Sequence, residues 1–154
     1  NNITGFPTET RKLAFDTIEI NRHVDATNQN IYSFVPFHGT PLRTLTEKMG
    51  LIAHETITKC LINKPQVILP DYPPEQIEGI KRCFSLYVKF PKSRWKDIEK
   101  AEKFDEEGNK IYKDLKLEYL EKYMPKINGD PTFGLNKISN VRNDMQKGYA
   151  DEMS

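Results

Sequence analysis

The chain has 154 residues and carries 23 Lys and Arg against 22 Asp and Glu, a formal net charge of +1. This balance gives no electrostatic case for a nucleic-acid or membrane-surface partner, so any charged site must be local. No apolar run approaches the ~20 residues that a membrane-spanning helix needs, and no basic stretch leads into an apolar core at the N-terminus. We therefore expect a soluble protein with no membrane partner, and its two isolated cysteines, read as free thiols, fit a reducing cytoplasm.

The first predicted elements are a strand-like segment at residues 1–5 and a helix after it. Thr8 is a candidate N-cap for this helix, and Glu9 would then place a carboxylate in its first turn. The apolar positions extend the helix to about Val24 and spread over one broad side. We therefore expect other elements to cover that side.

Residues 28–35 contain the β-branched and aromatic side chains typical of a strand, and Pro36 ends it. Thr40 before Pro41 predicts a short helix that ends at Gly50. The order strand, helix, strand, helix is typical of a parallel sheet with crossover helices. Because two strands cannot complete such a sheet, we expect either that they pair with sequence outside this chain or that this early part is not independently stable.

Three helices are predicted after a proline-containing connection. The first begins at Pro74 and ends before Pro91, the second covers about residues 93–104, and the third covers about residues 110–124. A turn is expected at residues 105–109. The apolar stripe predicted for the first of these helices consists of Ile77, Ile80, Phe84, Tyr87 and Val88.

The two cysteines, Cys60 and Cys83, have no CxxC spacing and no neighbouring histidine, so neither zinc nor a redox dithiol is indicated. We expect both to be buried free thiols, because free cysteine behaves as a small hydrophobe. His23, His38 and His54 are scattered without ligand spacing, which favours surface or packing roles. The sequence predicts no catalytic residue and no metal ligand within the chain.

Two loops carry the sharpest functional signal. Residues 3–10 read Ile-Thr-Gly-Phe-Pro-Thr-Glu-Thr, and residues 34–42 read Phe-Val-Pro-Phe-His-Gly-Thr-Pro-Leu. Each follows a predicted parallel strand, and the carboxyl ends of such strands are where α/β sheets and barrels bind ligands. Gly5 could let a ligand approach the backbone, and amides near Thr8 could meet a polar or anionic group. Ordinary strand-to-helix loops have a similar composition, so these residues alone leave both interpretations open.

These loops resemble two signatures of radical S-adenosylmethionine enzymes. Residues 5–10 are similar to the Gly-x-Pro-Gly-Glu-Thr signature at the fifth barrel strand of that family, with Thr8 in place of a glycine. Residues 36–42 resemble the Pro-x-Pro-Gly-Thr-Pro-Leu segment after its sixth strand, with His38 in place of a proline. A later stretch, residues 86–105, looks like the tail of members that carry a cobalamin-binding domain in front of the barrel.

The resemblance implies an α/β fold made of the last strands and helices of a partial (β/α) barrel, followed by a small helical C-terminal domain. The implied division is residues 1–53 for the barrel part, 54–73 for a connecting segment and 74–124 for the helical domain. Residues 125–154 show no sustained period and are expected to be irregular or disordered.

The resemblance also implies the chemistry. The parent enzyme would reductively cleave S-adenosylmethionine to a 5′-deoxyadenosyl radical, and cobalamin-dependent methyl transfer to an unreactive substrate carbon is the favoured subclass. The family's CxxxCxxC motif, which holds its 4Fe-4S cluster, is absent here. The resemblance therefore assigns the cluster ligands and the cobalamin domain to an N-terminal part outside this chain.

The family's fifth and sixth strands supply apolar and backbone contacts to the adenosine. These contacts carry over to Ile3, Gly5, Phe34, Val35 and Pro36. Asn1 and Asn2, on the same strand as Ile3, could line the substrate cavity. A rival function class is a non-catalytic helical interaction module built from residues 74–124, because an amphipathic stripe is equally compatible with it.

Overall fold

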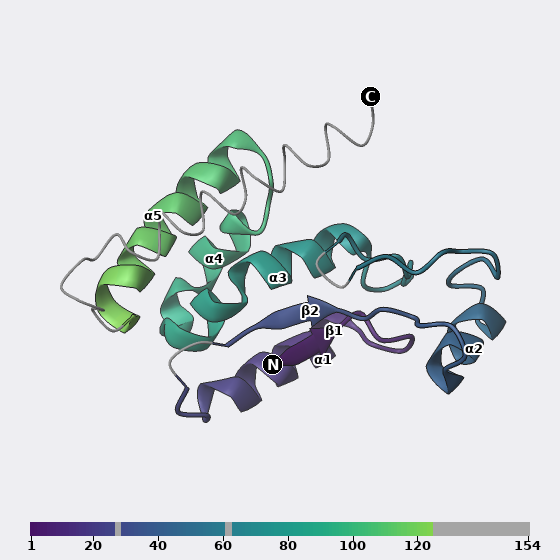
Figure 1. The fold of residues 1–154 in the computed structure, drawn as a ribbon. Helices are drawn as coiled ribbons and strands as arrows, with labels where there is room; N and C mark the ends of the chain where they lie inside the picture. The colour runs from purple at the N-terminus through teal and green to yellow at the C-terminus, as the bar shows by residue number, and fades with distance from the viewer. Residues whose placement is uncertain (27–28, 61–62, 125–154) are drawn as a thin grey trace.

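The computed structural model describes residues 1–26, 29–60 and 63–124. Within this part the chain is mostly helical, with five α-helices and one parallel sheet of two strands (Figure 1). The mixed helical and parallel-strand character predicted from the sequence is confirmed in this coarse form. The prediction for residues 125–154 falls outside the described residues.

The sheet joins the two segments that the sequence predicts as strands. Strand β1 covers Asn2–Thr4 and strand β2 covers Ile31–Ser33, and the two run parallel with Ile3 directly beside Tyr32. Side chains alternate between the faces of a strand, so Ile3 and Tyr32 share one face of the sheet. Their sequence neighbours, including the buried side chain of Thr4, lie on the other face.

Helix α1 (Arg11–Arg22) connects β1 to β2. Its N-cap is Thr10, whose hydroxyl accepts a hydrogen bond from the backbone N–H of Leu13. The prediction that Thr8 caps this helix is therefore wrong. Glu9 turns back to bind backbone amides of the preceding loop, which delays the start of the helix.

Helix α2 (Pro41–Lys48) begins as predicted, with Thr40 as its N-cap. Gly50 follows it with a φ of +68°, the left-handed conformation that commonly ends a helix. The buried side chains of α2 are polar ones, Arg43 and Thr46. Its exposed side chains include the apolar Leu42, Leu45 and Met49. Polar contacts therefore hold this helix in place.

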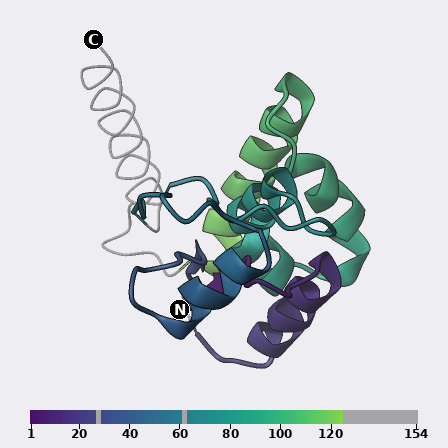
Figure 2. The ribbon, with the colours of Figure 1, turned by 90° about the vertical axis from the view of Figure 1, so that its right-hand side faces the viewer.

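Three further helices form the rest of the described chain, α3 (Pro74–Lys89), α4 (Trp95–Ala101) and α5 (Glu106–Tyr123). A 3-10 turn at Lys92–Arg94 precedes α4. Helix α3 is central, because it contacts α1 and β2 as well as α4 and α5. Helix α2 lies at the opposite end of the described chain from α4 and α5 in Figure 1, and this end faces the viewer in Figure 2.

Helix α5 starts earlier than predicted. Asp105 is its N-cap and accepts a hydrogen bond of 2.7 Å from the backbone N–H of Gly108. Glu106 and Glu107 occupy the first turn, where negative charge is favourable at the positive end of the helix. The predicted turn over residues 105–109 is wrong, because this acidic segment supplies a cap and a first turn.

The core is built on the apolar stripe of α3, which is buried as predicted. Side chains from α1, from the loop after β2 and from α4 and α5 join the same cluster, so a continuous core connects the strands to the helices. Representative members are Ala14, Ile18, Phe34, Ile98 and Leu115. Cys83 is buried, as predicted, whereas Cys60 is exposed and that part of the prediction is wrong. The domain boundaries inferred from the sequence stay predictions.

Candidate functional site

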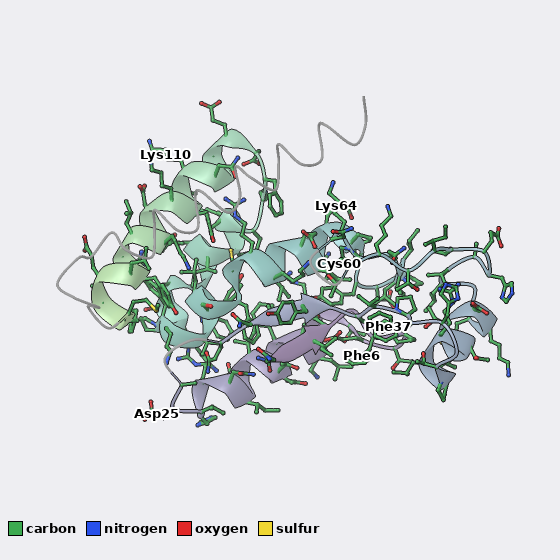
Figure 3. All side chains as sticks on the ribbon, in the orientation of Figure 1. Phe6, Asp25, Phe37, Cys60, Lys64 and Lys110 are labelled. Atoms are coloured by element: carbon green, nitrogen blue, oxygen red, sulfur yellow. The ribbon has the colours of Figure 1, made fainter. Side chains whose placement is uncertain are left out.

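The loops that follow β1 and β2 meet at the carboxyl end of the sheet (Figure 3). The Phe34 backbone N–H donates a hydrogen bond of 2.7 Å to the carbonyl oxygen of Thr4, which continues the strand pairing into the loop. The rings of Phe6 and Phe34 pack with their centroids 5.0 Å apart. The two sequence motifs are therefore one place in the structure. We call residues 3–10 and 32–40 the strand-end site.

Glu9 closes the first loop of the strand-end site. Its carboxylate accepts hydrogen bonds from the backbone N–H groups of Gly5 and Phe6 and from the hydroxyl of Thr4. The Thr4 hydroxyl also lies 3.2 Å from the hydroxyl of Tyr72, a buried side chain. The chain's own carboxylate thus occupies amides at this turn, which removes them as a subsite for an anionic ligand.

Gly5 is required by the protein's own packing. Its φ is +89°, a left-handed conformation that favours glycine. A Cβ atom at this position would lie 3.2 Å from Cδ1 of Ile77 in α3. The close approach to the Gly5 backbone is therefore made by Ile77.

Arg43 anchors the second loop from within. Its side chain is 3% exposed, and its guanidinium donates hydrogen bonds to three backbone carbonyl oxygens. These belong to Pro36 at 3.2 Å, His54 at 2.8 Å and Thr56 at 3.0 Å. Nε of Arg43 also pairs with the carboxylate of Glu47. Hydrogen bonds of this kind are what allow a cation to be buried.

Further hydrogen bonds fix the backbone on both sides of Pro36. The hydroxyl of Thr58 donates to the Pro36 carbonyl oxygen at 3.1 Å. The Phe37 backbone N–H donates to the carbonyl oxygen of Val35 at 3.0 Å, and the Thr40 hydroxyl donates to that of Phe37 at 2.8 Å. The Phe37 side chain is nevertheless 56% exposed. The loop therefore presents an aromatic ring from a constrained backbone.

The five residues predicted to contact adenosine come together here, but they divide into two groups. Ile3 is 49% exposed and Val35 is partly exposed, and neither belongs to the core cluster. Gly5, Phe34 and Pro36 are buried. Only Ile3 and Val35 thus have side chains accessible to a ligand, while the other three shape the loops from within.

Tyr32 is a site residue that sequence reasoning missed. It pairs with Ile3 across the sheet, is partly exposed and stays outside the core cluster, whereas its neighbour Ile31 packs against that cluster. We call Ile3 and Tyr32 the open face of the sheet. The strand register identifies this pair, and the sequence does not fix the register.

Asn2 does not line a cavity as expected. Its side chain exchanges hydrogen bonds of 2.8 and 3.1 Å with the side chain of Asn21 in α1, so it faces the helix. Asn1 is exposed and is approached by the side chain of Asn30 at 3.5 Å. The open face therefore begins at Ile3.

The cysteines and histidines of the described residues do not form a metal site. No group of three His, Cys, Asp or Glu within residues 1–26, 29–60 and 63–124 could hold a metal ion. Burial raises the pKa of Cys83 to about 12, so this thiol stays protonated at neutral pH. Because one cysteine is buried and the other exposed, they do not fit the set of thiolates that holds a four-iron cluster.

No protein-family model, curated protein or solved structure matches this chain. Among the helices of the described residues, none combines the length and the apolar character needed to span a membrane. Function is therefore inferred from the geometry of the strand-end site and from the two sequence motifs that form it.

Proposed function

We propose that this chain is the C-terminal part of a radical S-adenosylmethionine enzyme, and that its strand-end site contacts the adenosine of S-adenosylmethionine. The observation that carries the proposal is the meeting of the two signature loops at the carboxyl ends of adjacent parallel strands. Such strand ends are the usual ligand sites of α/β sheets and barrels, because strands fix the positions of loops that are free to vary.

The accessible side chains suit a flat, mostly apolar nucleoside. Ile3 and Val35 would supply apolar contacts, and Tyr32 would add an aromatic surface beside Ile3. A small number of polar groups on a mainly apolar lining is typical of small-molecule sites. Bound S-adenosylmethionine supplies radical chemistry on reductive cleavage. The part of this chain is to bind and orient the nucleoside and to keep water away from it.

The metal chemistry belongs to another part of the enzyme. Cys60 and Cys83 do not fit a 4Fe-4S cluster, so its ligands would come from an N-terminal part. Cobalamin-dependent methyl transfer is the subclass that we propose from the resemblance over residues 86–105, with cobalamin held by a separate domain.

The rival function, a helical interaction module at residues 74–124, has less support. Its apolar stripe would have to be accessible to a partner, yet Ile77, Ile80 and Phe84 are at most 1% exposed. They pack within a core shared with α1 and the loop after β2. This burial favours the enzyme.

The test is product formation. The full-length enzyme, reconstituted with iron and sulfide without oxygen and then reduced with dithionite, should form 5′-deoxyadenosine from S-adenosylmethionine. Residues 1–154 alone should form none and should bind no cluster, since they offer only two cysteines. If the full-length enzyme forms no 5′-deoxyadenosine, or if residues 1–154 suffice, the proposal is wrong.

A further inference from the structure

A buried arginine lies behind the second loop of the strand-end site. Arg43 is 3% exposed although it belongs to α2, the helix whose leucines face outward. Removing a guanidinium from water is strongly unfavourable unless hydrogen bonds replace its hydration. The burial of Arg43 is therefore explained by the groups to which it donates hydrogen bonds.

Arg43 forms hydrogen bonds with two segments, one before and one after α2 in the sequence. Nη1 donates to the Pro36 carbonyl oxygen in the loop after β2, whereas Nη2 donates to the carbonyl oxygens of His54 and Thr56 beyond α2. The same Pro36 carbonyl oxygen accepts a second hydrogen bond from the Thr58 hydroxyl. The segment around residues 54–58 therefore braces the site loop through one carbonyl group.

We propose that Arg43 is a positioning residue for S-adenosylmethionine, with Thr58 as its partner. By fixing the Pro36 carbonyl group they set where Val35 stands relative to Ile3 on β1. A binding site depends on supporting hydrogen bonds of this kind to keep its contact residues in place. This inference rests on the proposed function. It assigns a role to Arg43 and Thr58, which both lie outside the two sequence signatures.

Arg22 provides a matched control. Its Nη1 donates to the carbonyl oxygens of Tyr87 at 2.7 Å, Val88 at 3.0 Å and Phe90 at 2.7 Å. These carbonyl groups lie at the end of α3, whereas the strand-end site contacts the beginning of α3 through Ile77. Lysine at either position keeps the charge but loses the planar fork of donors. Both variants lose comparable contacts, and only one of them touches the site loop.

The experiment is a calorimetric titration of the reconstituted full-length enzyme with S-adenosylmethionine. Arg43→Lys should raise the Kd about tenfold, the lower end of the losses found when the residues that orient metal ligands from behind are mutated. Arg22→Lys should leave the Kd within about twofold of wild type, although both variants lower the thermal unfolding midpoint. An unchanged Kd for Arg43→Lys, or an equal rise for Arg22→Lys, would overturn the inference.

A milder pair covers the case in which Arg43→Lys does not fold. Thr58→Val removes one hydrogen bond to Pro36, and Thr17→Val removes a comparable one to the Leu13 carbonyl oxygen within α1. Thr58→Val should raise the Kd about threefold and Thr17→Val should not change it. Equal values for these two variants would overturn the inference while the proposed function stands. Absence of binding by the wild-type enzyme would remove both.

Discussion

The helical region, α3 to α5, and the strand region, β1 to α2, place their apolar and polar side chains differently. In the helical region the apolar stripe faces inward, with Phe84 only 1% exposed. In the strand region Ile3 and Phe37 are about half exposed, whereas Arg43 and Thr46 are buried. Core packing accounts for the helical stripe, but it does not account for the exposed positions of Ile3 and Phe37.

Because of this difference, we expect the proposed binding function to reside in the strand region. The carboxylate of Glu9 and the guanidinium of Arg43 each bind backbone groups of a site loop. Ordered loops on rigid elements that present accessible apolar side chains are typical of binding sites. The helical region, by contrast, contributes its apolar surface to the common core, so we assign it a supporting role.

The largest expected effect breaks the packing side of the comparison. Phe84→Ala should lower the free energy of unfolding by about 3 to 5 kcal/mol, because it leaves a cavity in the core. Phe37→Ala, a matched change at a 56% exposed ring, should change it by less than about 0.5 kcal/mol. Urea unfolding measures both values. Similar losses for the two variants would show that Phe37 packs like a core residue.

The next effect concerns the ion pair that connects the strand region to the helical region. Arg11 of α1 makes two hydrogen bonds, of 2.8 and 2.9 Å, with the carboxylate of Glu102, which also accepts one from the Tyr87 hydroxyl. Glu102→Gln should cost about 2 kcal/mol, since it leaves a partly buried guanidinium without its counter-charge.

The control for this change is Glu118→Gln. Glu118 pairs with Arg94 and Lys122 near the surface of the helical region, so its loss should cost less than about 1 kcal/mol. Urea unfolding of both variants decides the matter. Equal costs would mean that Arg11 and Glu102 contribute no more than a surface pair.

A smaller effect concerns the glycines of the two site loops. Gly5 and Gly39 both have a positive φ, so alanine at either should cost about 1 kcal/mol. Only Gly5 faces a close neighbour, Ile77, and Gly5→Ala should therefore cost about 1 kcal/mol more than Gly39→Ala. Thermal unfolding provides the comparison. A larger loss of stability for Gly39→Ala than for Gly5→Ala would contradict the close packing of Ile77 against Gly5.

The smallest effect concerns the thiols. Burial raises the pKa of Cys83 from 9.0 to about 12, so the native state keeps a proton that the unfolded state loses above about pH 9. The contribution of Cys83 to stability is therefore complete below that pH and declines as pH rises toward 12. At about pH 8.5 an alkylating reagent should modify exposed Cys60 and should reach Cys83 only on unfolding. Rapid native labelling of Cys83 would contradict its burial.

The sequence predicts the helical stripe and the parallel strands well because their signals are local. Spacings of three, four and seven identify the buried side of α3, and Thr40 before Pro41 identifies the start of α2. Thr8 is a misleading N-cap candidate, because the return of Glu9 to the loop amides decides where α1 begins. The preference of a single residue for the N-cap position does not show that a neighbouring side chain will bind loop amides instead of joining the helix.

The sequence predicts the position of the candidate site but not which of its side chains are accessible. The two loops are found by their motifs, but the accessible residues depend on contacts distant in the sequence. Ile77 covers Gly5, and the register places Tyr32 beside Ile3. The sequence gives no sign that Arg43 is buried, because three of the partners of its guanidinium are backbone carbonyl groups outside α2.

The central claim is that adenosine binds at the strand ends. The most direct test is to measure the affinity for S-adenosylmethionine after a charge is placed on the open face. Ile3→Asp in the reconstituted full-length enzyme should raise the Kd at least about tenfold, because a carboxylate would replace an apolar contact to the nucleoside. Ile20→Asp is the control, a 66% exposed isoleucine of α1 outside both the strand-end site and the segment that braces it, and it should leave the Kd unchanged. Equal affinities for Ile3→Asp and wild type would contradict the placement of adenosine on the strand ends.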